Sequence, residues 1–169
     1  GSALSFDGIN DWVTVTDSDL LDLTNGMTLE AWVYPTTAPT GWRSTVVKEA
    51  SDAVSYFLYA SSNVSNRPAN GVTIGGTEYH VTGGSQLPTN TWTHITATYD
   101  GADQRLYVNG VHVRSQTRTG SMSASTNPLR MGGNGIWGEY FQGRIDEVRI
   151  YNRALSAGEI QADMAIVIE

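Results

Sequence analysis

The sequence consists of many short segments of strand-forming residues separated by turn residues. Segments of this length and spacing are typical of a β-sandwich, and they leave little room for helices. The expected strands are Leu4 to Phe6, Trp12 to Thr16, Thr28 to Tyr34, Ser44 to Lys48, Ser55 to Ala60, Val72 to Ile74, Glu78 to Thr82, Thr93 to Tyr99, Arg105 to Val108, Val111 to Ser115, Leu129 to Met131 and Gly143 to Tyr151.

Two local signals are stronger than the rest. The pair Asn109-Gly110 separates two strand-like segments and predicts a tight antiparallel hairpin, because a two-residue type I′ turn requires positive φ at both positions. Near the end of the chain, Ser156 is followed three residues later by Glu159. This spacing predicts a capping box and one short helix that ends near Met164.

The length of 169 residues fits one domain with a sizeable core. We expect residues 3–164 to form that domain, with Gly1-Ser2 as the scar of a cleaved tag and residues 165–169 as a strand or a linker stub. The formal charge of −7 argues against nucleic acid as a partner, because phosphate binding requires clustered Lys and Arg. No apolar run is long enough for membrane insertion, and the absence of Cys excludes disulfides.

The segment GRIDEVRIYNRA, from Gly143 to Ala154, places an acid inside an expected strand. Strict alternation would put Asp146 on the same face as Arg144, Val148 and Ile150, so that its carboxylate would face the core. A buried carboxylate is strongly destabilised unless a cation or several donors compensate it. The sequence therefore raises the question of what pairs with Asp146.

The run FDGIND near the N-terminus supplies further hard oxygen ligands of the kind that Ca²⁺ prefers. We predict a structural calcium ion between the two ends of the chain, with ligands from Asp7, Gly8, Asn10 and Asp146. Two metal-free arrangements compete with it. The Asp and Asn side chains of the run can cap local backbone amides, and Asp146 can pair with Arg144 or Arg149.

Six segments carry a family resemblance: ALSFDGINDWVTV (3–15), MTLEAWVYP (27–35), NTWTHITATYDG (90–101), RLYVNGVHV (105–113), LRMGG (129–133) and GRIDEVRIYNRALSAGEI (143–160). In this order they resemble a laminin-G-like jelly roll of the concanavalin A-like lectin/glucanase superfamily. The resemblance implies an all-β, two-sheet antiparallel sandwich with one short C-terminal helix, in a secreted or cell-surface protein. Members of this family include glycan-binding modules, adhesion modules and appendages of enzymes, so the resemblance leaves the function open.

Catalysis is not expected. Glucanases on this fold place two or three carboxylates at alternate positions of one strand, and no strand here has that pattern. Glu30 stands alone in its segment, Glu139 is followed by three residues without a carboxylate, and Asp146 and Glu147 are adjacent and so are expected on opposite faces. A pair of acids from different strands remains open.

The remaining signal for function is aromatic. Trp32 and Trp92 occupy positions where the family pattern also has Trp, so we expect them to pack, whereas Trp42 and Trp137 lie in glycine-containing loops where the pattern does not require Trp. Such rings either stack on the apolar faces of sugars or fold back as lids over the ends of the core. The strongest candidate ligand-binding patch is Trp42, Arg43, Trp137 and Tyr140.

The sequence thus predicts a non-catalytic, calcium-stabilised module that binds a polysaccharide or cell-surface glycan. In a secreted multidomain protein, other domains of the same chain are further candidate partners. The alternative is a protein-binding adhesion or spacer domain without a sugar site. A common groove lined by Trp42 and Trp137 would favour the first hypothesis, and burial or separation of the two rings would favour the second.

Overall fold

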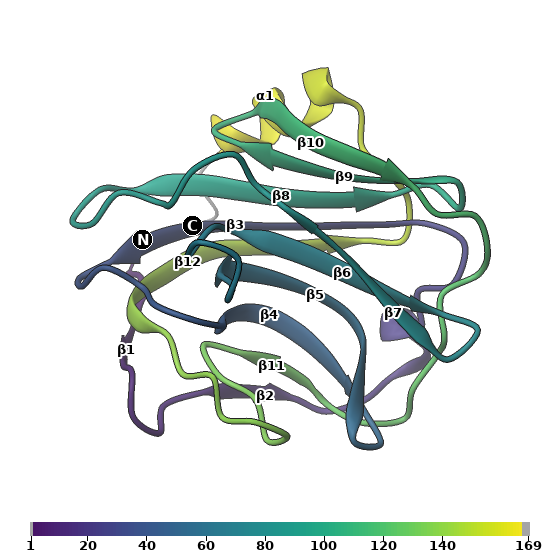
Figure 1. Cartoon of the computed structure of the whole chain (residues 1–169), viewed down its shortest axis with the longest axis horizontal. Helices are drawn as coiled ribbons and strands as arrows, with labels where there is room; N and C mark the ends of the chain where they lie inside the picture. The colour runs from purple at the N-terminus through teal and green to yellow at the C-terminus, as the bar shows by residue number, and fades with distance from the viewer. Residues whose placement is uncertain (1, 167–169) are drawn as a thin grey trace.

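Within residues 2–166, which the computed structural model describes, twelve strands pair into two six-stranded antiparallel sheets (Figure 1). The first sheet, in spatial order, consists of β1 (Leu4–Asp7), β12 (Gln142–Tyr151), β3 (Met27–Pro35), β8 (Thr93–Tyr99), β9 (Asp103–Val108) and β10 (Val111–Thr117). The second consists of β2 (Val13–Val15), β11 (Leu129–Met131), β4 (Arg43–Ala50), β5 (Ala53–Ser61), β6 (Ala69–Ile74) and β7 (Thr77–Thr82). The predicted sandwich is confirmed, and each expected strand is present with small differences at its ends.

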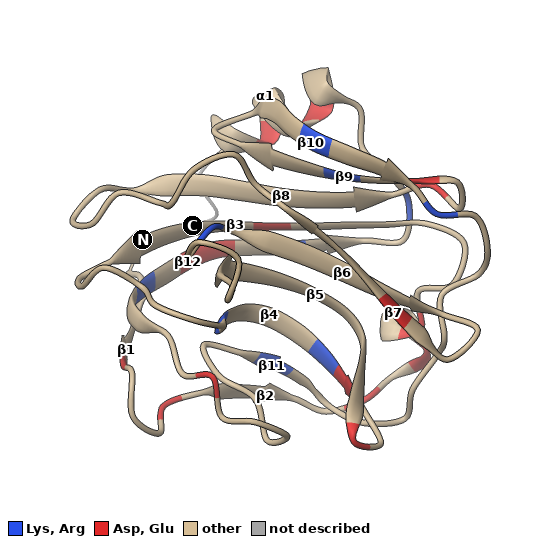
Figure 2. Cartoon of the chain, in the orientation of Figure 1, with Lys and Arg blue, Asp and Glu red and all other residues tan. Residues whose placement is uncertain are grey.

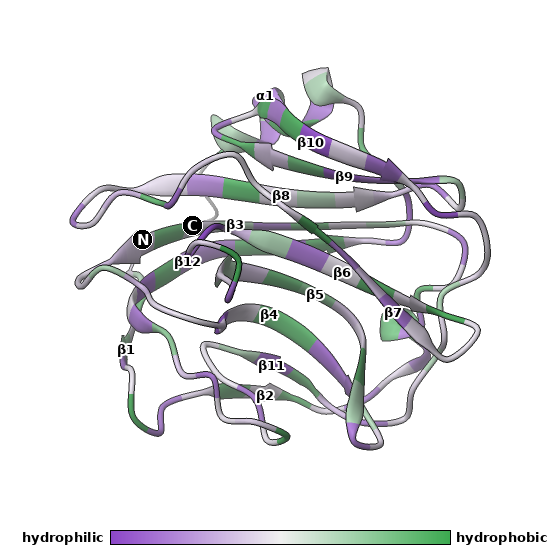
Figure 3. Cartoon of the chain, viewed as in Figure 1, coloured by the Kyte–Doolittle hydropathy of each residue, from purple (hydrophilic) through white to green (hydrophobic). Residues whose placement is uncertain are grey.

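The main apolar core lies between the two sheets. Strands β3 and β8 contribute alternate side chains from the first sheet, and β5 contributes alternate side chains from the second, together with one Val each from β4 and β6. Figure 3 shows the hydrophobic positions recurring along these strands. Fully buried members of this core include Leu29, Ala31, Val33, Val46, Tyr56, Leu58 and Ile95.

Strand β5 is buried on both of its faces. Tyr56 and Leu58 belong to the core between the sheets, whereas Phe57 and Tyr59 belong to a second apolar cluster on the opposite face. Neither β5 nor its neighbour β6 carries a charged residue (Figure 2). We call the side of the second sheet that is turned away from the first sheet the outer face; its centre is apolar.

Strand β12 departs from the alternation expected of it. Asp146 pairs with Trp32, but the next paired residue is Arg149, opposite Glu30, so a bulge lies between Asp146 and Arg149. Glu147 within the bulge has φ of 52°. Because an extra residue reverses the side-chain alternation, Val148 packs on the core while Asp146 does not share its face. The prediction that Asp146 faces the core is wrong for this reason.

Both strong local signals are confirmed. Asn109 and Gly110 have φ of 50° and 71°, as the type I′ hairpin between β9 and β10 requires. Helix α1 (Ala157–Met164) begins with the predicted capping box of Ser156 and Glu159. The short 3₁₀ helix η1 (Asp19–Leu21) was not predicted, and residues 167–169 of the expected linker stub lie outside the described residues.

No helix in the described part of the chain has the length and apolar character that a membrane crossing requires.

Helix α1 lies beside a buried acid on the first sheet. Glu30 of β3 is fully buried, on the face of β3 opposite to Leu29 and Ala31. Burial raises the pKa of Glu30 to about 7, and the nearby carboxylate of Asp163 adds to the shift while Arg149 opposes it. The folded protein therefore favours the protonated form of this carboxyl group.

We expect Glu30→Gln to stabilise the protein at about pH 8 and to change its stability little at about pH 4. Because the folded-state pKa lies above the unfolded value of 4.5, wild-type stability is lost as the pH rises from about 4.5 through about 7. The neutral amide avoids this loss, and the gain is on the order of 3 kcal/mol, since the pKa rises from 4.5 to about 7 and one pKa unit corresponds to about 1.4 kcal/mol. Urea denaturation at both pH values measures it, and an equal gain at both would contradict the expectation.

Candidate functional site

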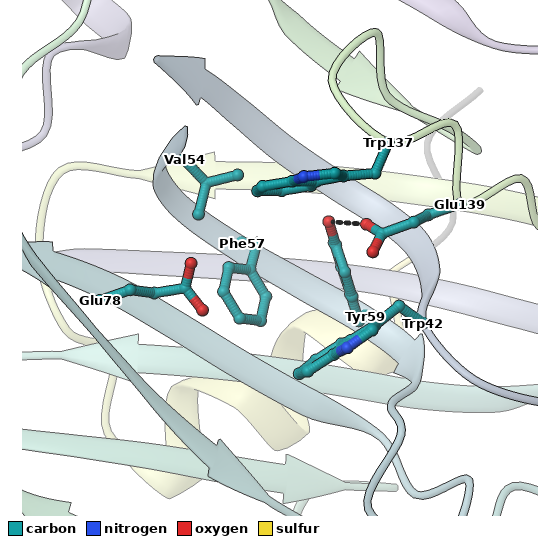
Figure 4. Close-up of a pocket in the computed structure, with 7 residues that line it drawn as sticks. All are labelled: Trp42, Val54, Phe57, Tyr59, Glu78, Trp137 and Glu139. Atoms are coloured by element: carbon teal, nitrogen blue, oxygen red, sulfur yellow. Dashed lines mark hydrogen bonds between the residues drawn. The ribbon is translucent and has the colours of Figure 1, made fainter. Parts of the chain in front are cut away.

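A pocket of about 330 Å³ lies on the outer face of the second sheet. Its lining consists of Trp42, Val54, Phe57, Tyr59, Glu78, Trp137 and Glu139. Figure 4 shows Phe57 and Tyr59 in the middle, with the two Trp rings on two sides and the two carboxylates on the other two. We call this the outer-face pocket.

The floor of the outer-face pocket comes from β5 and depends on a glycine of β6. Phe57 and Tyr59 project from the same face of β5, and their ring centroids are 4.6 Å apart. Gly71 is paired with Phe57 across the sheet, and a Cβ atom at Gly71 would lie 2.0 Å from Phe57 Cε1. Any larger residue at this position would therefore displace the ring that forms the floor.

Trp42 forms one wall of the pocket. It precedes β4 and makes edge contacts with Phe57, Tyr59 and His80 at centroid distances of 6.0, 5.5 and 5.7 Å. The indole is half-buried, so one part packs on the sheet and another part faces the pocket. Its orientation is fixed by the aromatic side chains beneath it.

The opposite wall is a short loop organised by Asn134. Asn134 is fully buried, and its Oδ1 accepts hydrogen bonds from the backbone N–H groups of Ile136 and Trp137 at 3.2 and 2.7 Å. Its Nδ2 donates to Ser44 Oγ at 3.0 Å. This side chain ties the loop to the sheet and presents Trp137, which is 52% exposed.

Glu139 follows Trp137 in the same loop and is held in the pocket by two donors. Its Oε2 accepts hydrogen bonds from Tyr59 Oη at 2.6 Å and from Asn134 Nδ2 at 2.8 Å. Glu139 has φ of 49°, a left-handed conformation that costs a residue with a side chain on the order of 1 kcal/mol. Burial and the Glu139 carboxylate both raise the pKa of Tyr59, so the phenol stays protonated and keeps donating.

Glu78 of β7 provides the second carboxylate. It approaches from the opposite side of the aromatic floor (Figure 4). Desolvation raises the pKa of Glu78, His80 opposes the shift, and the negative charge of Glu139 adds to it. The two acids are therefore close enough to influence each other across the pocket.

The structure brings together half of the predicted ligand-binding patch. Trp42 and Trp137 line the same pocket, which is the arrangement expected of a sugar site. Arg43 and Tyr140 instead line a separate, smaller hollow of about 140 Å³. The Arg43 Nη1 donates to the carbonyl oxygen of Trp42 at 2.8 Å, and Tyr140 stacks on Trp12 at a centroid distance of 5.7 Å.

Sequence reasoning missed Phe57, Tyr59 and Glu78 as lining residues. A signal for two of them was present, because Phe57 and Tyr59 are two positions apart in the expected strand Ser55 to Ala60, and alternation places both rings on one face of it. Glu78 carried no comparable signal. It reaches the pocket only because β7 lies at the end of the sheet beyond β6.

The predicted calcium ligands do not meet. Asp7 is paired with Gln142 across β1 and β12, so Asp146 lies four residues further along, or about 13 Å at the rise of a β-strand. Asp7 Oδ1 accepts hydrogen bonds from the backbone N–H groups of Ile9 and Asn10 at 2.7 and 3.3 Å. This is the local turn that the sequence left open as an alternative.

Asp146 is engaged in its own bulge, where its Oδ1 accepts a hydrogen bond from the Glu147 N–H at 2.9 Å. Among residues 2–166, no group of three or more His, Cys, Asp or Glu side chains is placed to hold a metal ion. Asp7, Gly8, Asn10 and Asp146 therefore do not fit one shared calcium ion. Binding of calcium to this chain stays a prediction.

The acids weighed for catalysis do not gather at one site. Glu147 pairs with Arg149 at 3.0 Å on the first sheet, Glu30 is buried there, and Glu139 lies in the outer-face pocket of the second sheet. Because of the bulge, Asp146 and Glu147 line one shallow groove with Trp32 and Trp92. The expectation that these two acids point to opposite faces is wrong.

Comparison of the sequence with known protein families gives a match over most of the chain. Residues 7–161 match the family described as Laminin_G_3, of the concanavalin A-like lectin/glucanases superfamily. The chain belongs to this family. The match covers every strand except most of β1 and extends into α1, so the resemblance inferred from six sequence segments is confirmed.

Solved structures with the same fold include carbohydrate-binding domains. Domain 4 of AbnA, an extracellular GH43 arabinanase from Geobacillus stearothermophilus, was solved with arabinotriose and is similar with a TM-score of 0.76 and 22% identity, over 95% of this chain and 75% of that one. The CBM40 of the Ruminococcus gnavus IT-sialidase, bound to α2,3-sialyllactose, is similar with a TM-score of 0.77 and 14% identity, over 96% of both chains.

The mouse laminin α1 domains LG4-5 are also similar, with a TM-score of 0.69 and 15% identity, over 91% of this chain and 44% of that one. Comparison with curated protein sequences gives no significant match. The Laminin_G_3 domain described here thus resembles, in its fold, carbohydrate-binding domains of larger enzymes.

The turn after β1 gives a test of the role of Asp7. We expect Asp7→Ala to lower the free energy of unfolding by about 1 kcal/mol, because two backbone N–H groups lose their acceptor. Asp7→Asn keeps an amide oxygen at the same place and serves as the matched control, with little loss. Thermal unfolding with EDTA and with added calcium completes the experiment. Calcium-dependent stabilisation that both variants lose would contradict a purely local role for Asp7.

Proposed function

We propose that this Laminin_G_3 domain is a non-catalytic carbohydrate-binding module of a secreted multidomain protein, and that the outer-face pocket holds its glycan. The observation that carries the proposal is the position of two Trp residues. Trp42 and Trp137 come from separate loops and lie on two sides of one pocket. Aromatic rings arranged in this way stack on the C–H faces of sugar rings.

Polar groups beside the rings match the hydroxyl groups of a sugar. The carboxylates of Glu139 and Glu78 accept hydrogen bonds, and a sugar ring bound on the floor of Phe57 and Tyr59 presents hydroxyl donors around its rim. Glu139 is already fixed by Tyr59 and Asn134, so its side chain loses little additional conformational entropy when a ligand binds to it. The pocket combines an apolar base with few oriented polar groups, which is typical of small-ligand sites.

The similar structures support the same proposal. Domain 4 of the arabinanase and the CBM40 of the sialidase were each solved with an oligosaccharide, and each is named as one part of a larger enzyme. Their likeness to this chain is in the fold. The likeness therefore does not identify the glycan of this domain, which has to be inferred from the pocket side chains and determined by experiment.

We expect Trp137→Ala to weaken binding of a glycan identified on a broad array by about 30-fold or more, since loss of a stacking anchor costs about 2 kcal/mol. Trp137 is 52% exposed, so the fold should be preserved. Trp42→Ala should weaken binding to a similar extent, compared at matched thermal stability because this ring also packs on the sheet. Isothermal titration calorimetry measures all three affinities.

The matched control is Trp92→Ala. Trp92 is 36% exposed and lies against Tyr34 of the first sheet, on the other side of the sandwich from the pocket. The Trp92→Ala variant should bind the glycan with the affinity of the wild type. Equal affinities of the wild type, Trp42→Ala and Trp137→Ala would reject the outer-face pocket, and the absence of any array hit would favour a protein-binding or spacer domain.

The same pocket is not expected to hydrolyse its ligand. Glycoside hydrolysis requires a proton donor and a second carboxylate that are both fixed on either side of the scissile bond. Glu139 is fixed, but Glu78 is exposed, and no hydrogen bond within residues 2–166 orients its carboxylate. Assays of reducing-end release on the bound glycan should therefore give no product. Product formation that Glu78→Gln or Glu139→Gln abolishes would show that the domain is an enzyme.

A further inference from the structure

The outer-face pocket is unusual in the sign of its charges. Among the residues that the structure describes, the seven that line this pocket include two acids and no Lys or Arg. A ligand that enters the pocket therefore meets two carboxylates over an aromatic floor. This electrostatic environment bears directly on which glycans the proposed site accepts.

Two arginines beside the walls of the pocket are engaged elsewhere. Arg43 lines the smaller hollow and donates to the Trp42 carbonyl oxygen. Arg130 forms an ion pair with Glu49 at 3.4 Å, and its guanidinium lies 4.8 Å from the centroid of the Trp12 ring. Neither side chain lines the pocket, and within residues 2–166 neither forms an ion pair with Glu78 or Glu139.

His80 is a further titratable group beside the pocket. It contacts the edge of Trp42, and its imidazole opposes the rise in the pKa of Glu78. The pKa of Glu78 is raised by desolvation; His80 lowers it by more than the carboxylate of Glu139 raises it. The two acids nevertheless face one aromatic space that no Lys or Arg lines.

The carboxylate of Glu139 retains acceptor capacity for a ligand. Both hydrogen bonds that it accepts from side chains in residues 2–166 are made by Oε2. Its other oxygen, and both oxygens of Glu78, can accept from a donor in the pocket. A protonated amine offers up to three donors and a positive charge, and it is also attracted to the faces of Trp rings.

From this arrangement we infer that the pocket selects glycans by charge. For one glycan backbone, affinity falls in the order free amino sugar, neutral sugar, sugar with a carboxylate or sulfate. The inference rests on the proposed carbohydrate-binding function and adds the class of ligand. A unit charge about 4 Å from a carboxylate at a solvated site is worth about 1 kcal/mol, which corresponds to about fivefold in affinity for each step.

The test is a glycan array that carries each backbone in neutral, amino and carboxylated or sulfated forms. A β-1,4-glucan series illustrates the design, with cellotriose, the trisaccharide of glucosamine and the C6-oxidised trisaccharide. Every backbone that binds should bind best as the amino form and least as the acidic form. Calorimetry on the three forms of one bound backbone then gives the ratios of the dissociation constants.

Two variants separate charge from shape. Glu78→Gln keeps the size of the side chain and removes one negative charge, so the preference for the amino form over the acidic form should fall at least fivefold. Asp19→Asn removes the same charge from η1, where Asp19 is exposed and outside the pocket. This control should keep the wild-type ratios.

The outcomes distinguish the two proposals. Acidic forms that bind as tightly as neutral forms, or ratios that Glu78→Gln leaves unchanged, would overturn charge selection while the carbohydrate site stands. Binding of all forms that is insensitive to Trp137→Ala would overturn the pocket as the site. If no form of any backbone binds, the proposed function fails and charge selection fails with it.

Discussion

The burial of β5 on both faces is the constraint on which the rest of this structure depends. Tyr56 and Leu58 fill the space between the sheets, and the next positions, Phe57 and Tyr59, place two aromatic rings on the outer face. An exposed apolar sheet face is unfavourable in water. The loops before β4 and before β12 therefore cover this face, and the incomplete cover leaves the outer-face pocket.

The loops that cover the outer face depend on polar residues as much as on apolar ones. Asn134 is buried and uses both ends of its amide, accepting from two backbone N–H groups and donating to Ser44 and Glu139. A buried amide that lost these partners would be strongly destabilised. The same hydrogen bonds that keep the loop folded thus fix Trp137 and Glu139, so stability and the shape of the site depend on one side chain.

How much of the fold could be predicted from the sequence depends on whether each structural feature is determined by neighbouring residues. The strands, the turn at Asn109-Gly110 and the capping box at Ser156 are encoded locally, and they were predicted closely. The bulge in β12 was missed because alternation assumes an unbroken strand, and Glu147, unlike Gly, gives no warning of positive φ. That one residue moved Asp146 off the core face and removed the argument for a calcium ion there.

The site was predicted less completely because it depends on sheet order. Trp42 and Trp137 were identified by their place in glycine-containing loops, but they are 95 positions apart, and only the pairing of β4, β5 and β6 brings Phe57 and Tyr59 beneath both. Arg43 and Tyr140 are close in sequence to Trp42 and Trp137, but they line a different hollow. They were assigned to the same site because they are near the two Trp residues in sequence. Glu78 could be placed only once β7 was known to lie beside β6.

The relation between fold and ligand explains why the proposed glycan specificity is argued from the pocket side chains. Two domains with nearly equal structural similarity to this chain, at TM-scores of 0.76 and 0.77, were solved with arabinotriose and with sialyllactose, a neutral and an acidic oligosaccharide. A common sandwich therefore sets no single ligand charge. Since the sheets are shared, the sign of the charge must be read from the side chains on the loops and on the outer face. In this chain those side chains are Glu78 and Glu139, placed over an aromatic floor.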